Sequence, residues 1–330
     1  MTDSGANRWT HPAVILVATD LSDLDRLMPF ALEQAAQTGA RLILLHAIAT
    51  AAAMSVDAVG MPYYDPSAAL EFAEKELKPW CETARRQNIG CDGLVREGHA
   101  TQQIAAAARQ FQADRILLGT RSRSRLGKML LGSVAEQVLR SVNLPVITVG
   151  PEAHLLVETD AQSGREERVV LHATTLRETS RPSAALACKM AASLRAKLVL
   201  LNVLPPPVDG PPPVYGIDEM RSGALPTGLD SAAMRELRLL AEETGAGCCL
   251  DIEPVVVHGN PSIEILAVAS ERHANLIVLG STQRSAFENL TRDRTVYQVL
   301  AHARCPVLTI REPLAMSAEV ASESVAAFHG

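Results

Sequence analysis

Short apolar runs alternate along the chain with segments whose apolar residues recur at helical spacing. Val14–Ala18 and residues 41–46 are runs of the kind found in strands buried on both faces of a sheet. The segment between them has helical spacing, and Gly39 is expected to end it. Asp25 is the predicted N-cap of this helix, and Pro29 is placed in its first turn.

The same alternation continues through the first half of the chain. After a loop at residues 49–66, we expect a helix through Asn88, a strand at 93–96, a helix at 101–110, a strand at 115–118, a helix after Gly132 and a strand at 146–149. Strands that alternate with helices in this way form a parallel sheet with helices on both faces. The predicted fold class is therefore α/β.

The pattern occurs twice. The segment at 95–104 resembles 256–265, with Gly98 aligned to Gly259 in a turn role, and the segment at 113–120 resembles 274–281 at the same offset. We therefore predict two copies of one domain. The expected divisions are a disordered N-terminus at 1–11, domains at 12–150 and 167–313, a linker at 151–166 and a tail at 314–330. A second loop, at 205–227, is expected to be extended.

Composition narrows the function classes. Thirty-one basic and 37 acidic residues give a net charge of −6, which argues against a nucleic-acid coat or a polybasic membrane surface. No apolar run approaches the roughly 18 residues of a spanning helix. Residues 1–10 are polar, without a secretory core. We expect a cytoplasmic protein with neither nucleic acid nor membrane as a partner.

Cysteine and histidine provide no catalytic or metal motif. The six cysteines include no C-x-x-C pair and no zinc-ligand spacing, so we expect buried or half-buried thiols without a disulfide scaffold or a structural metal. His46 ends one predicted strand and His172 lies within another, which favours structural roles. No motif brings a nucleophile and a base together, so no catalytic residue is predicted.

Two loops of the first copy carry residues suited to a nucleotide. In open parallel sheets, ligands bind beyond the carboxyl ends of the strands where the strand order reverses. Thr19 and Asp20 follow the first strand, and a loop from Gly119 ends at Gly132 and Ser133. A carboxylate can accept from a base or ribose hydroxyl, while free amides near Gly132 and the Ser133 hydroxyl can hold phosphate. Alternatively, Asp20 caps the next turn and Gly132–Ser133 only begins a helix.

The second of these loops is basic. Arg121, Arg123, Arg125 and Lys128 lie within eight residues of one another. They can clamp phosphates or meet an acidic partner, or they can form a solvated loop without a ligand. Arg123 is the best single candidate for a phosphate contact.

The spacing of this loop resembles that of the universal stress protein family. Nucleotide-binding members carry Gly, two residues, Gly, nine residues, then Gly-Ser or Gly-Thr. Gly119, Ser122, Gly132 and Ser133 occupy these places, so one glycine is replaced. Residues 130–136 and 144–149 also match the family style. The two copies resemble the tandem, UspA-like members of the family over nearly the whole chain.

The resemblance implies a fold and a ligand. Each copy would be a flavodoxin-like or Rossmann-like domain with a five-stranded parallel sheet. Asp20 would meet adenine or ribose, Ala47 would offer main-chain contacts to the base, and Ser122 would weaken the phosphate site. The expected ligand is ATP, or ADP or AMP, with or without Mg²⁺. The predicted site residues are Thr19, Asp20, Ala47, Gly119, Ser122, Arg123, Gly132, Ser133 and Val134.

The second copy departs from this pattern. Thr175, Gln283, Asp293 and Arg294 stand where the first copy has Asp20, Ser122, Gly132 and Ser133. A carboxylate at 293 would repel a phosphate, so we expect no ordinary nucleotide site there.

The working hypothesis is nucleotide-dependent regulation of the stress response without chemical turnover. Binding would order the loop at 120–131, and an unknown protein partner would sense the change. The last strands, at 146–149 and 307–310, are expected at sheet edges, which tend to pair with a neighbour. The resemblance to the family implies that they join the copies as an internal pseudo-dimer, and two chains can associate further as a homodimer. A slow Mg²⁺-dependent ATPase and a nucleotide-free scaffold are the alternatives.

Overall fold

A computed structural model of the chain describes residues 11–48, 65–120, 131–153, 167–205, 227–245, 250–282 and 294–312. The predicted linker, both long loops and both terminal segments lie wholly or mainly outside these ranges, as do Ser122 and Arg123.

Five strands of the first copy form a parallel sheet. They are β1 (Val14–Thr19), β2 (Arg41–Ile48), β3 (Cys91–Glu97), β4 (Arg115–Gly119) and β5 (Val146–Val149). Their order is β3-β2-β1-β4-β5, and each neighbouring pair is parallel. All six residues of β1 are buried, which confirms the prediction of a strand covered on both faces.

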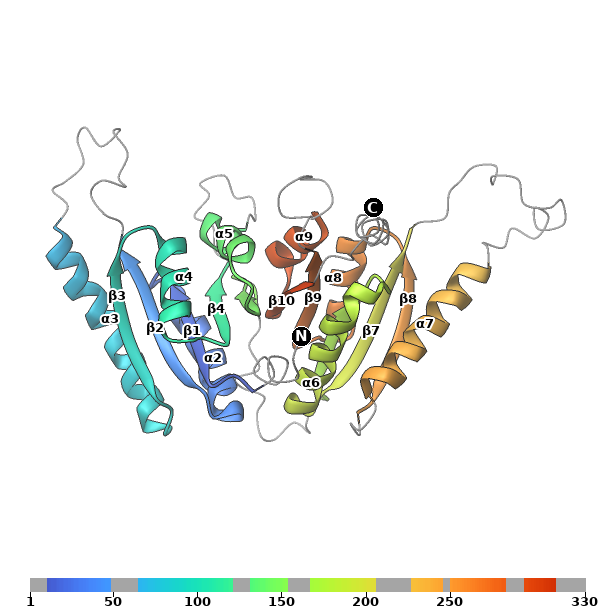
Figure 1. Cartoon of the computed structure of the whole chain (residues 1–330), viewed down its shortest axis with the longest axis horizontal. Helices are drawn as coiled ribbons and strands as arrows, with labels where there is room; N and C mark the ends of the chain where they lie inside the picture. The colour runs from blue at the N-terminus through green and yellow to red at the C-terminus, as the bar shows by residue number, and fades with distance from the viewer. Residues whose placement is uncertain are drawn as a thin grey trace, which may run out of the picture.

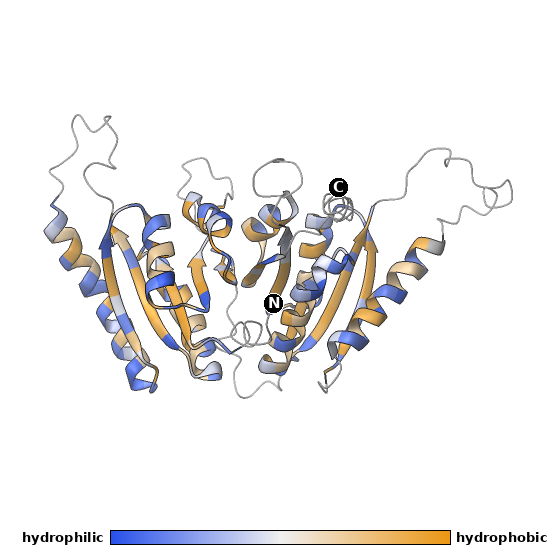
Figure 2. Cartoon of the chain, in the orientation of Figure 1, coloured by the Kyte–Doolittle hydropathy of each residue, from blue (hydrophilic) through white to orange (hydrophobic). Residues whose placement is uncertain are grey.

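Two helices cover each face of this sheet. The helices are α2 (Leu24–Thr38), α3 (Pro66–Arg86), α4 (Ala100–Gln110) and α5 (Ser133–Ser141). Leu27 of α2 shares one buried cluster with Val17, while Ile104 of α4 shares the other with Leu16. Successive β1 side chains therefore point to opposite layers. Figure 2 shows hydrophobic residues along the strands and polar residues on the outward sides of the helices.

The second copy repeats this architecture. Its strands are β6 (Val169–Ala173), β7 (Lys197–Leu204), β8 (Ile252–His258), β9 (Leu276–Thr282) and β10 (Val307–Glu312). Its helices are α6 (Arg181–Leu194), α7 (Thr227–Gly245), α8 (Pro261–Glu271) and α9 (Arg294–His302), with a 3-10 turn, η3 (Glu178–Ser180), before α6. The parallel order β8-β7-β6-β9-β10 mirrors that of the first copy.

The two sheets join edge to edge into one sheet of ten strands (Figure 1). β5 pairs antiparallel with β10, so that Val307 lies opposite Thr148. The Thr148 hydroxyl also donates to the Val307 carbonyl over 3.3 Å. The predicted internal pseudo-dimer through the last strands is confirmed.

A second inter-copy contact lies beside the sheet. Arg115 is almost completely buried and donates to Gln34 Oε1 over 2.7 Å and to Met190 Sδ over 3.4 Å. Gln34 belongs to α2 and Met190 to α6, so this side chain connects the two copies. Burial lowers the pKa of Arg115 to about 10, which leaves it charged at neutral pH. Nearby, Arg168 and Glu33 form a 3.0 Å ion pair.

The start of α2 corrects two predictions, the N-cap at Asp25 and the first-turn position of Pro29. The helix begins at Leu24 with Asp23 as its N-cap, so Asp25 lies in the first turn and does not cap it. Pro29 lies inside the helix, where its ring nitrogen cannot donate the usual hydrogen bond to the preceding turn. The predicted stop at Gly39 is confirmed, since this residue is left-handed at φ 72° and its N–H bonds to the Ala35 carbonyl.

The turn role of Gly98 and Gly259 is also confirmed. Their φ angles are 130° and 150°, which side chains rarely adopt. A Cβ at Gly98 would lie 2.8 Å from Gln103 Nε2, and one at Gly259 would lie 2.4 Å from Glu264 Oε1.

Among the described residues, no helix combines the length and apolar character that crossing a membrane requires.

His172 gives the second copy a pH-dependent stability. The residue is fully buried in β6, and its Nδ1 donates to the Val278 carbonyl over 3.0 Å. Its Nε2 has no hydrogen-bond partner within the described ranges. Burial lowers the pKa of His172 to about 4, against about 6.5 in an unfolded chain. The folded state therefore favours the neutral ring.

We predict that wild-type stability falls as pH drops from about 6.5 to about 4, because only the unfolded state takes up this proton. Val17 holds the matching register position in the first copy, so His172→Val is the natural test. Relative to this variant, the wild type should lose about 2 kcal/mol between pH 7 and 4.5. Urea unfolding at both pH values measures this. Equal losses in the two proteins would contradict it.

Candidate functional site

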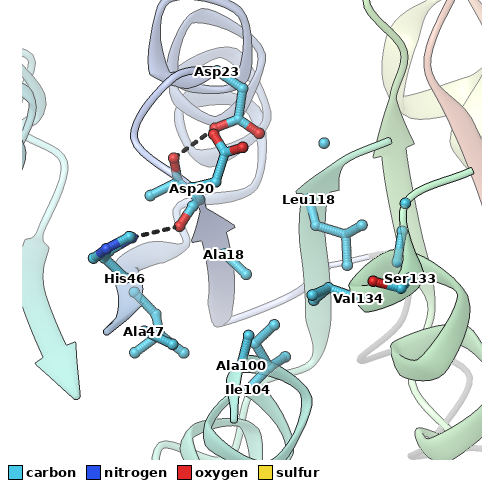
Figure 3. A pocket seen from close by; sticks show the side chains of 15 residues that line it. Ala18, Asp20, Asp23, His46, Ala47, Ala100, Ile104, Leu118, Ser133 and Val134 are labelled. Atoms are coloured by element: carbon cyan, nitrogen blue, oxygen red, sulfur yellow. Dashed lines mark hydrogen bonds between the residues drawn. The ribbon is translucent and has the colours of Figure 1, made fainter. Parts of the chain in front are cut away.

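A pocket of about 250 Å³ opens at the carboxyl ends of β1, β2 and β4, beside the N-terminal ends of α4 and α5. Figure 3 shows Asp20 and Asp23 at one end, with Ser133 and Val134 across from them. Seven predicted site residues line this pocket: Thr19, Asp20, Ala47, Gly119, Gly132, Ser133 and Val134. The tertiary structure therefore brings together three loops that are far apart in the sequence.

The floor of the pocket is apolar. Ala18 of β1, Leu45 of β2 and Leu118 of β4 are buried there, and Ile104 of α4 forms a wall. These side chains can cover the face of a flat, weakly polar group such as a purine.

The loop after β1 is held by its own side chains. The Thr19 hydroxyl donates to Asp23 Oδ1 over 2.6 Å and accepts the Leu21 N–H over 2.9 Å. Leu21 has a φ of 72°, a left-handed conformation uncommon for leucine. Thr19 thus uses its hydroxyl to shape the loop, and its predicted contact with a ligand remains a prediction.

Asp20 takes the capping role considered from the sequence, and its contact with a ligand remains a prediction. Its Oδ1 accepts from the Ser22 N–H over 2.9 Å and from the Ser22 hydroxyl over 2.6 Å, which is the capping arrangement. The residue is exposed, and its Oδ2 accepts no hydrogen bond from the described residues. One carboxylate oxygen is therefore available at the pocket.

Asp23 is a pocket residue that the sequence analysis missed. Only 4% of it is exposed, and burial raises the pKa of its carboxyl above the ordinary value, while the Thr19 hydrogen bond opposes this shift. A Cβ at Gly119 would lie 2.2 Å from Asp23 Oδ2. This contact explains the glycine at position 119, because the Asp23 carboxylate fills the space that a side chain would need. The run Thr19–Asp23, with two acids directly after a buried strand, was the available signal.

His46 supports the same loop from β2. Its Nδ1 donates to the Thr19 carbonyl over 3.0 Å. In the second copy, Asn202 takes this place and donates to the Thr174 carbonyl over 2.9 Å. A histidine is thus not required for this bond, which fits the structural role predicted for His46. Ala47, the next residue, lies at the pocket with its main chain in β2.

The opposite end of the pocket is the start of α5. Gly132 is the N-cap, with φ −62° and ψ 141°, and no side chain caps the helix. Ser133 is therefore the first helical residue and not its cap, although the helix does begin after Gly132 as predicted. First-turn amides have no intrahelical acceptor and carry the positive end of the helix dipole. This end of the pocket is chemically suited to an anion.

The second copy keeps the loop frame without the acid. The Leu176 N–H donates to the Thr174 hydroxyl over 3.1 Å, and Leu176 is left-handed at φ 59°. Thr175, in the place of Asp20, pairs its hydroxyl with that of Ser180 at 2.9 Å. Gln283 and Asp293 lie outside the described residues, and Arg294 begins α9.

The chain belongs to the universal stress protein family. The family model matches residues 13–150 and again residues 167–311, which shows two such domains in tandem.

Individual relatives agree with this assignment. Over 142 residues the chain is 31% identical to a universal stress protein of Thermus aquaticus, a match that covers 41% of this chain and 96% of the relative. It is 31% identical over 81 residues to a universal stress protein of Methanocaldococcus jannaschii, covering 24% of this chain and 45% of the relative. The chain thus spans about half of the latter protein.

Solved structures share the tandem fold. A universal stress protein of Archaeoglobus fulgidus has a TM-score of 0.66 at 19% identity, with 92% of this chain and 98% of that chain covered. A protein of unknown function from Pseudomonas aeruginosa has a TM-score of 0.61 at 18% identity, with 93% and 95% covered. At these identities the likeness concerns the fold alone.

The close approach of Asp23 to Gly119 predicts a coupled mutational effect. Gly119→Ala should destabilise the chain by about 1–3 kcal/mol, since the new methyl group displaces the Asp23 carboxylate from Thr19. In an Asp23→Ala background the same change should cost clearly less. Urea unfolding of the four proteins measures the coupling. Gly93→Ala is a control, because its Cβ would make only 3.6 Å contacts. Additive effects of the two substitutions would refute the coupling.

Proposed function

We propose that the chain is a nucleotide-dependent regulatory protein of the stress response, with an adenine nucleotide site in its first copy. One observation carries this proposal: across an apolar floor, the open oxygen of Asp20 faces the uncapped N-terminus of α5 in one pocket. A hydrogen-bond acceptor, an apolar surface and an anion site are the three environments that the ribose hydroxyls, the base and the phosphates of a nucleotide require.

Each part of the ligand has a proposed partner. Adenine lies on Ala18, Leu45 and Leu118, with main-chain contacts from Ala47. The ribose hydroxyls donate to Asp20, and the phosphates accept from the Ser133 and Val134 amides and the Ser133 hydroxyl. Glycine at the N-cap leaves this approach clear of a side chain. Ser122 and Arg123 are proposed as further phosphate contacts. Bound Mg²⁺ would be held mainly by the phosphates.

We propose binding and signalling without turnover. The titratable side chains that line the described pocket are Asp20, Asp23 and His46. Asp23 and His46 hold the loop after β1 through hydrogen bonds, and the open oxygen of Asp20 is assigned to the ribose hydroxyls, so we assign no side chain to the activation of water. The proposed output is a change in the loop at 120–131 that a protein partner senses, in a cytoplasmic chain acting alone or as a homodimer. The second copy is proposed to bind no nucleotide.

Gly132→Asp tests the anion site and copies the residue found at 293. Aspartate is a good N-cap, so the helix should be kept, while its charge repels phosphate. We expect ATP affinity, measured by calorimetry, to fall at least about tenfold, with unchanged circular dichroism and urea midpoint. Unchanged ATP affinity would refute the phosphate assignment.

Asp20→Thr tests the ribose end by installing the residue found at 175. The threonine hydroxyl can accept the Ser22 N–H that Asp20 now accepts, but threonine removes the carboxylate. ATP affinity should fall about tenfold or more, the usual effect of losing a charged hydrogen bond. Thr175→Ala is the matched control and should leave the ATP affinity unchanged.

Two further results would favour the alternative functions. Steady phosphate release from ATP would favour the ATPase, and absence of any ATP binding by the wild type would favour the nucleotide-free scaffold.

A further inference from the structure

Two cysteines face each other at the outer edge of the first copy. Cys81 lies on α3 and Cys91 begins β3, the outermost strand of that half of the sheet. The Cys91 thiol donates to Cys81 Sγ over 3.2 Å, and each residue is 3% exposed. A disulfide bond is about 2.0 Å long, so closing it needs a movement of only about 1 Å.

Packing alone does not explain a thiol at this place. Cys91 pairs with Leu42 across β2, and in the second copy Ile252 holds the same register opposite Leu198. The duplicate therefore fills this position with an aliphatic side chain. The other two described cysteines, Cys188 and Cys305, are also buried, and the Cys188 thiol donates to the Thr244 carbonyl over 3.1 Å.

The surroundings make the two thiols unequal. The hydrogen bond from Cys91 lowers the pKa of Cys81, and the nearby Arg85 guanidinium, which donates to the Cys91 carbonyl over 2.8 Å, adds to this effect. The same hydrogen bond, together with burial, raises the pKa of Cys91. Cys81 is therefore the thiol of the pair that loses its proton more readily, and Cys91 is the resolving thiol. The adjoining residues 87, 88 and 90 are exposed, so a small local opening gives a small oxidant access.

We propose that Cys81 and Cys91 form a reversible, peroxide-sensitive dithiol site, a function separate from nucleotide binding. The Cys81 thiolate attacks one peroxide oxygen, the O–O bond breaks, and a sulfenic acid and hydroxide form. The Cys91 sulfur then attacks Cys81, and the hydroxyl group leaves as water. In total, two thiols and one hydrogen peroxide give one disulfide and two waters. A thiol reductant restores the pair.

The bond would fix the end of α3 to the start of β3 at the sheet edge. The bond would close a short loop and so reduce the conformational entropy of the unfolded chain. The oxidised protein should therefore have an equilibrium constant of unfolding about 100-fold smaller than that of the reduced protein. Redox-sensing pairs of this kind are transient and reversible, unlike permanent structural disulfides.

Peptide mapping of the full chain tests the proposal. The reduced protein is treated with hydrogen peroxide, alkylated in denaturant and digested with trypsin without reduction. Cleavage after Arg85, Arg86 and Arg96 separates peptides 76–85 and 87–96 unless the bond joins them. We expect the joined pair, lighter by two hydrogen atoms than the sum, to form at least about tenfold faster than Cys305 oxidises. Dithiothreitol should reverse it.

Two variants separate pairing from general oxidation. Cys91→Val should leave Cys81 as a sulfenic acid that dimedone traps, whereas Cys305→Ala should leave the joined peptides unchanged. Loss of ATP binding in any of these proteins would concern the nucleotide site and not this one. Absence of the joined peptides at peroxide levels that oxidise Cys305, or their formation no faster than that oxidation, would overturn the proposal.

Discussion

Parallel pairing of β1 with both β2 and β4 is the constraint on which the site depends. Parallel strands bring their carboxyl ends to one edge of the sheet, and the chain runs from β1 to α2 on one face but from β4 to α5 on the other. The loops that follow β1 and β4 therefore separate and leave a crevice between them. Asp20 and the start of α5 meet across it, although more than a hundred residues divide them in the chain.

The two copies show which parts of that edge serve folding and which serve chemistry. Both shape the loop with a threonine hydroxyl that accepts the N–H of a left-handed leucine, and both brace it with a side chain from the next strand. Position 23 is acidic in both copies, as Asp23 and Glu178, but only the first copy has an acid in the place of Asp20 and a glycine directly before its last helix. The same loop conformation therefore forms with an aspartate or a threonine at its second position.

The two copies are joined by backbone pairing between edge strands and by one buried side chain beside the sheet. β5 and β10 would each present an open edge, and their antiparallel pairing removes both. Arg115 then holds α2 and α6 together from inside the joint, with its charge buried but bonded. The outer edges, β3 and β8, remain the ends of the combined sheet, and the Cys81–Cys91 pair lies at one of them.

Apolar runs and helical spacing were enough to predict the strands and their alternation with helices, because both patterns are local. The duplication was visible because similar segments recur at a constant offset in the sequence. The same local signals placed Thr19, Asp20, Gly132 and Ser133 at strand and helix ends. They misplaced the cap of α2, since an acid at 25 looks as suitable as one at 23 until the chain turns. Only the tertiary structure decided that Asp23 fills the space beside Gly119, that Arg115 is buried and that two thiols meet. Each depends on contacts between separate elements, whose partners no local pattern identifies.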